Sequence, residues 1–173
     1  VKSGEILALT SYPEYDSETL VSGSDRRSIQ AYLNDKRTPF LNRAVSGLYA
    51  PGSVVKPIVA MGAQAEGVID PLKKILSTGS ISIPNPYDPE KPSVFKDWKA
   101  HGWVDMREAI AVSSDVYFYE IGGGFEDQKG MGIKNIEKYA RMFGLGEKTG
   151  IDLPGEEEGV IPNPEWKAKT FSG

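Results

Sequence analysis

Ser53 and Lys56 stand three positions apart in "PGSVVKP", a spacing that places both side chains on one face of a helix. A serine hydroxyl becomes a good nucleophile when a base removes its proton. Lysine can be that base where desolvation or a neighbouring cation lowers its pKa. The pair therefore suits acyl transfer through a serine ester. The same four residues also fit an ordinary helix cap followed by a solvated lysine.

A second group of hydroxyl and carboxyl side chains stands at Ser113, Ser114 and Asp115. Serine and aspartate favour helix caps over helix interiors, because their side chains compete for backbone hydrogen bonds. The simpler interpretation is a helix break, with Ser113 or Ser114 capping the next helix. The functional interpretation is a tight turn whose hydroxyl faces Ser53 and Lys56 and passes a proton between nucleophile and leaving group.

His101 is the only histidine, and a Ser-His-Asp triad would require it. It lies in "KAHGW", where no partner pattern accompanies it. We expect a structural role for His101. With one histidine and no cysteine, a metal site would depend on scattered carboxylates, so we predict neither a metal nor a cofactor.

Helices are predicted around both groups. Residues 51–67 read as an apolar, alanine-rich helix whose first turn is irregular, because Pro57 cannot donate to the Ser53 carbonyl. Residues 105–112 begin a helix with a capping box formed by Asp105 and Glu108. Residues 113–115 interrupt it, and an apolar run then resumes.

The rest of the chain is less regular. Residues 1–12 have strand character and read as a hairpin arm, and residues 25–35 form a short helix. Residues 77–104 are rich in proline and glycine and indicate irregular structure or short strands. Residues 132–144 give the clearest helical stripe, with Gly144 as its C-cap.

Composition limits the function classes. The chain has 173 residues, 39% hydrophobic and 25% charged, with a net charge of −4 and no basic stripe that would indicate nucleic acid. The absence of cysteine excludes a disulfide framework and a thiolate metal site. No apolar run approaches the roughly 18 residues of a membrane span. Both ends look cut, so we expect a piece of a longer protein.

Four collinear segments resemble the transpeptidase domain of class B penicillin-binding proteins, most closely the elongation-type branch called penicillin-binding protein 2. They are "GEILALTSYPEYD", "FLNRAVSGLYAPGSVVKPI", "HGWVDMREAIAVSSDVYFYEIG" and "MFGLGEKTGIDLPGE". The resemblance implies an α/β penicillin-recognising serine transpeptidase fold, also called β-lactamase/transpeptidase-like. This fold has an antiparallel sheet flanked by helices and a mostly helical lobe. Residues 1–173 would be the N-terminal portion of that domain.

The resemblance also assigns roles. Ser53 matches the nucleophile, Lys56 its base and Ser113 the serine that relays protons. Asp115 falls where most relatives have asparagine, at a substrate-binding position. Some elongation-branch members resemble this chain in having aspartate there. A carboxylate cannot donate the hydrogen bond that an asparagine amide would offer the substrate.

Lys148, Thr149 and Gly150 spell Lys-Thr-Gly, the third sequence box of such enzymes. That box should sit in an alternating strand lining the cleft. Here it follows the helix that ends at Gly144 and runs into "IDLPGEEEG", whose proline and glycines are typical of a turn. We predict that Lys148 is not catalytic and that the true third box lies beyond Gly173.

The implied function is peptidoglycan D,D-transpeptidation in cell-wall elongation and cell shape, inhibited by β-lactams. Implied partners are stem peptides, β-lactams, a membrane-embedded glycan polymerase and other elongation-complex proteins, without nucleic acid. The parent would be membrane-anchored and act on the periplasmic face. Alternatives are a serine β-lactamase or β-lactam sensor of the same fold, and a non-catalytic scaffold of the cell-wall machinery.

Overall fold

The computed structural model describes residues 3–85, 87–88 and 90–171. The chain divides into two compact units. One consists of the first 50 residues together with Lys148–Gly159, and the other of Pro51–Glu147 together with the segment after Gly159. Within the described residues, no helix is both long and apolar enough to cross a membrane.

The first unit carries three short helices, α1 (Ser17–Ser22), α2 (Arg26–Asn34) and α3 (Arg43–Ser46). Asp25 caps α2 by accepting from the backbone N–H groups of Arg27 and Ser28. The predicted hairpin arm over residues 1–12 is wrong for residues 3–12, which form no strand. A strand needs a hydrogen-bonded neighbour, and none of the described residues pairs with this segment.

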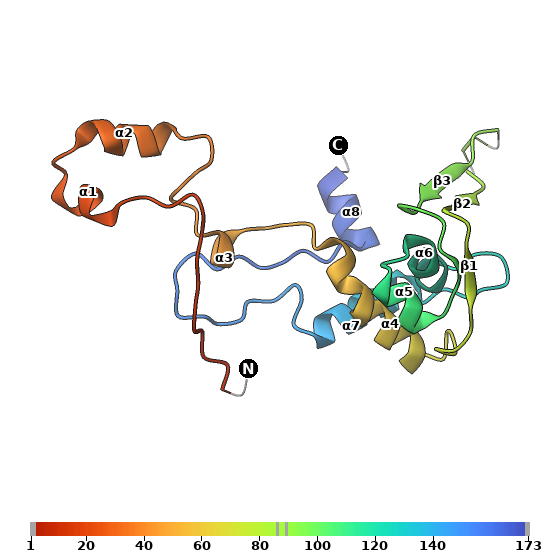
Figure 1. Cartoon of the computed structure of the whole chain (residues 1–173). Coiled ribbons are helices and arrows are strands. Elements are labelled where there is room, and N and C mark those ends of the chain that lie inside the picture. The colour runs from red at the N-terminus through yellow and green to blue at the C-terminus, as the bar shows by residue number, and fades with distance from the viewer. Residues whose placement is uncertain (1–2, 86, 89, 172–173) are drawn as a thin grey trace. The chain divides into compact units, whose positions relative to one another are not determined.

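The second unit is built around helix α4 (Lys56–Ala65), which follows a 3₁₀ turn, η1 (Gly52–Val55). Helices α5 (Met106–Ala111), α6 (Asp115–Gly123) and α7 (Gly132–Met142) gather beside it, and α8 (Pro164–Phe171) follows later in the chain (Figure 1). The irregular first turn predicted before α4 is confirmed as η1. The capping box at Asp105 and Glu108 is also confirmed.

Two small antiparallel sheets complete this unit. In one, β1 (Ile75–Ser77) pairs with β4 (Gly102–Val104), and in the other, β2 (Ser80–Ile83) pairs with β3 (Ser93–Lys96). Strands β2, β3 and β4 are the short strands expected between residues 77 and 104, whereas β1 begins before that range. The pairing carries residues 97–101, which follow β3, back toward β1, where the His101 N–H donates to the Ser77 carbonyl.

One apolar core joins α4, α5, α6, β1 and β4. Close approach of α4 to α7 depends on Gly62, where an added Cβ would lie 2.8 Å from the Tyr139 side chain of α7. The core is made of the following buried side chains: Ala60, Ala63, Ile69, Ile75, Val104, Met106, Ala109, Tyr117, Phe118, Ile121 and Met131. Helices α4 and α6 therefore pack into the same apolar core.

Candidate active site

Ser53 lies in the 3₁₀ turn that leads into α4, and its side chain is exposed. Gly52 has φ +57°, a left-handed conformation that glycine adopts without steric cost. The Lys56 N–H then donates to the Ser53 carbonyl. The sequence therefore presents a hydroxyl to solvent one turn before a lysine at the helix start.

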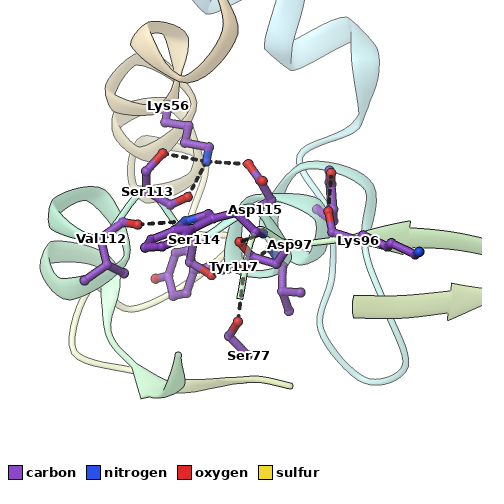
Figure 2. Close-up of polar contacts among 12 residues, drawn as sticks. Lys56, Ser77, Lys96, Asp97, Val112, Ser113, Ser114, Asp115 and Tyr117 are labelled. Carbon is purple, nitrogen blue, oxygen red and sulfur yellow. Dashed lines mark hydrogen bonds and ion pairs between the residues drawn. The ribbon is translucent and has the colours of Figure 1, made fainter. Parts of the chain in front are cut away.

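Lys56 is buried, with only 9% of its surface exposed, and its ammonium faces the turn that follows α5. Its Nζ atom lies 2.8 Å from the Ser113 carbonyl oxygen, 3.0 Å from Ser113 Oγ and 2.6 Å from Asp115 Oδ1 (Figure 2). An ammonium has three hydrogens to donate, and each has an acceptor here. A buried cation is tolerated when it is paired in this way.

Ser113 occupies the left-handed region, with φ +55°. This conformation is uncommon for a residue with a side chain and persists where the surroundings impose it. On one side, the Ser114 N–H donates to the Ala109 carbonyl and ends α5. On the other, Ser114 Oγ accepts from the Tyr117 N–H and caps α6. The turn thereby directs both oxygens of Ser113 at Lys56.

Asp97 supports this turn from the side opposite Lys56 (Figure 2). Its Oδ2 atom accepts from Ser114 Oγ at 2.9 Å and from the Val116 N–H at 3.0 Å. Burial raises the pKa of Asp97, but hydrogen bonds from the Val116 N–H and others outweigh it and lower the pKa from 3.8 to about 2. The carboxylate is therefore a stable buried acceptor. Sequence reasoning missed Asp97 because residues 77–104 give no periodic signal.

The predicted residues are largely brought together. Lys56 donates hydrogen bonds to Ser113 and Asp115. Ser53 lies in η1, one turn before Lys56, where α4 begins. The ion pair of Asp115 with Lys56 was not foreseen, because the resemblance pointed to substrate at that position. The catalytic and substrate-binding roles themselves remain predictions.

His101 is buried, with 2% of its side chain exposed, and Nε2 lies 3.5 Å from Asp97 Oδ1. Its ring packs edge-on against Trp98, with 4.9 Å between the ring centroids. These contacts agree with the structural role expected for the only histidine.

Lys148, Thr149 and Gly150 lie in the first unit and belong to no helix or strand. The Thr149 N–H donates to Glu156 Oε1 at 2.6 Å, and the Gly150 N–H donates to Glu156 Oε2 at 3.1 Å. The prediction that this segment is not a strand is confirmed, and the turn itself lies just before it, at residues 143–146. The backbone N–H groups that a cleft strand would offer to a substrate are bound here by a local carboxylate.

The arrangement around Lys56 can move a proton. A lysine amine and a serine hydroxyl 3.0 Å apart are within range of direct proton transfer. An exposed hydroxyl, that of Ser53, also lies in the turn that leads into the same helix.

Comparisons with known proteins agree with this geometry. A family model described as the penicillin binding protein transpeptidase domain matches residues 1–173. The chain is 41% identical over 171 residues to the peptidoglycan D,D-transpeptidase MrdA of Acinetobacter baumannii, a match that covers 98% of this chain and 24% of that protein. The protein of the same name from Escherichia coli K12 is 37% identical over 172 residues, with 98% and 25% covered.

A solved structure is similar as well. The complex between penicillin-binding protein PBP2 and MreC from Helicobacter pylori contains a chain that matches with a TM-score of 0.84 and 36% identity. The match covers 98% of this chain and 30% of that one. The fold class predicted from the sequence is confirmed by this likeness. The chain spans about a quarter of the length of the curated relatives it matches.

Proposed function

We propose, since the chain belongs to the penicillin-binding protein transpeptidase domain family, that its parent protein is a peptidoglycan D,D-transpeptidase acting in cell-wall elongation. One observation carries the proposal. The buried Lys56 ammonium is bonded to Ser113 and Asp115, and the helix it begins is preceded by the turn that holds Ser53.

Acylation follows from these positions. Ser53 Oγ attacks the carbonyl carbon of a stem peptide, or of a β-lactam, and an ester forms as the C–N bond breaks. In this step the Lys56 ammonium first gives up one proton to solvent, and the resulting amine then takes the Ser53 proton. Ser113 gives its proton to the departing nitrogen and recovers one from Lys56, 3.0 Å away. Protons and charge balance without a cofactor.

Cross-linking is the second half of the reaction. The amine of a second stem peptide attacks the ester carbonyl, the C–O bond breaks, and Ser53 regains its proton through the same relay. The positive end of the helix dipole at the start of α4 favours the negative charge that develops beside Ser53 in both steps. We propose that Asp115, whose side chain is one-third exposed, contacts substrate as well as Lys56.

We propose that sequence outside these residues contributes the other parts of the enzyme. Residues 1–173 are proposed as the N-terminal portion of the transpeptidase domain, with the third box on strands contributed by later sequence. A membrane anchor and activity on the periplasmic face follow from the same assignment. Because PBP2 of Helicobacter pylori has been solved with MreC, a partner of that kind in the elongation machinery is proposed here too.

The test is covalent labelling of the full-length parent. A fluorescent penicillin should form a stable adduct that peptide mapping by mass spectrometry assigns to Ser53, and the Ser53→Ala variant should remain unlabelled. Rapid release of hydrolysed drug would favour a β-lactamase instead. A folded parent with no adduct would overturn the enzymatic proposal and leave a scaffold role.

A further inference from the structure

Asp97 stands behind the turn of residues 113–115 and contacts neither Lys56 nor the exposed Ser53 among the hydrogen bonds of the described residues. Its side chain is fully buried. Oδ2 accepts from three donors: Ser114 Oγ, the Val116 N–H and Ser77 Oγ at 3.2 Å. Burying a carboxylate is costly without hydrogen-bond donors, and these three donors offset that cost.

Trp98, the next residue, holds the other end of the same turn. Its Nε1–H donates to the Val112 carbonyl at 3.2 Å, although the indole itself is largely exposed. Asp97 and Trp98 therefore bind the chain on both sides of Ser113. Between these two anchors Ser113 adopts its left-handed conformation, with φ +55°.

We infer that Asp97 is a positioning residue for acylation: its buried carboxylate holds Ser113 and Asp115 in the orientation that meets Lys56. This inference rests on the proposed function. The Lys56 bonds to Ser113 and Asp115 span 2.6 to 3.0 Å, so a small displacement of the turn breaks them. A misplacement of about 1 Å in a catalytic group can cost about 100-fold in rate.

Two serines provide a matched pair of variants. Ser114 and Ser77 are both fully buried, and both donate to Asp97 Oδ2. Ser114 belongs to the turn, whereas Ser77 ends β1. Ser114→Ala and Ser77→Ala each remove one hydroxyl from the same carboxylate. Only the first releases the turn, so only the first should affect the chemistry.

The experiment measures acylation of the full-length parent by a fluorescent penicillin, separated into drug affinity before reaction and the acylation rate constant. We expect Asp97→Ala to lower the rate constant about 100-fold, and Ser114→Ala about 10-fold. Ser77→Ala should stay within about twofold. Drug affinity should be unchanged in all three. Rates are referred to the folded fraction, determined by thermal unfolding.

A double-mutant cycle and hydrogen exchange complete the test. If Asp97 acts through Ser114, the Asp97→Asn and Ser114→Ala effects will be less than additive. The Val116 amide should exchange faster in Asp97→Asn and at the native rate in Ser77→Ala. Equal rate constants for the two serine variants, or full additivity in the cycle, would overturn the inference.

The exchange measurement also separates the two proposals. If the native parent forms no adduct, the proposed enzymatic function fails, whereas a protected Val116 amide that depends on Asp97 still supports the positioning role. If the native parent is acylated but Val116 exchange does not respond to Asp97, the positioning role fails alone.

Discussion

The segments around Lys56 and Lys148 both read as boxes of a serine acyltransferase, yet their surroundings differ. At Lys56, the Ser113 oxygens and Asp115 converge on a buried ammonium. At Lys148, the side chain is exposed, and the neighbouring donors are bound by Glu156 of the same segment. A three-letter match does not distinguish these cases, but the convergence of acceptors on one lysine does.

Each segment is organised by one carboxylate. Asp97 collects donors from the turn of residues 113–115, and Glu156 collects the Thr149 and Gly150 N–H groups. Asp97 is buried and organises side chains that face a lysine, whereas Glu156 closes a loop on itself. The Asp97 arrangement positions side chains that contact Lys56. The Glu156 arrangement instead occupies the backbone N–H groups of Thr149 and Gly150.

The largest effect is expected from Lys56→Ala in the full-length parent. The variant loses both the proposed base and the ammonium that binds Ser113, so the penicillin acylation rate constant should fall about 1,000-fold. Fluorescent labelling over time measures this rate constant. Lys74→Ala, which removes another lysine of the second unit that pairs with Glu108 on the surface, is the matched control. A Lys56→Ala enzyme that labels at the native rate would refute the assignment of the base.

Acid should release the Asp97 contacts next. Because the pKa of Asp97 is depressed from 3.8 to about 2 in the folded protein, its stabilisation is fully present above pH 3.8 and is lost as pH falls toward 2. The shift corresponds to about 2 kcal/mol of unfolding free energy. Denaturant titrations between pH 5 and 2 should show this loss in the native protein and not in Asp97→Asn. Identical pH dependence in both would contradict it.

Local signals in the sequence predicted much of the scaffold of the site. The capping box at Asp105, the irregular turn before Lys56 and the break at residues 113–115 each depend on a few neighbouring residues. Propensity and capping act over that range, so the sequence reports them. The hairpin arm at residues 1–12 failed because a strand depends on a partner elsewhere, which its own residues do not specify.

The interior of the site was less predictable. Ser53, Lys56 and Ser113 were found through residue type and family likeness, but the role of Asp97 depends on tertiary contacts across 17 and 19 positions to Ser114 and Val116. No periodic pattern marks such a carboxylate. The Asp115 ion pair with Lys56 likewise appears only when α4 and α6 are packed together.

Asp115 should give an intermediate effect. Asp115→Ala removes the acceptor 2.6 Å from Lys56 Nζ, and we expect the acylation rate constant to fall about 10-fold, because the amine loses one orienting contact and keeps Ser113. Asp115→Asn retains an acceptor oxygen and should recover most of that loss. If Asn and Ala behave alike in the labelling assay, the negative charge matters and orientation does not.

The smallest effect is expected from Lys148→Ala. The Lys148 side chain is exposed. Glu156 holds this loop by accepting from the Thr149 and Gly150 N–H groups, and removal of the Lys148 amine leaves those bonds intact. Acylation of the full-length parent should stay within about twofold of native, as for a site independent of the reacting groups. Glu156→Gln is the companion variant, because it weakens the contacts that hold this loop and leaves Lys148 itself unchanged. A loss in Lys148→Ala as severe as in Lys56→Ala would show that this segment contributes to the cleft after all.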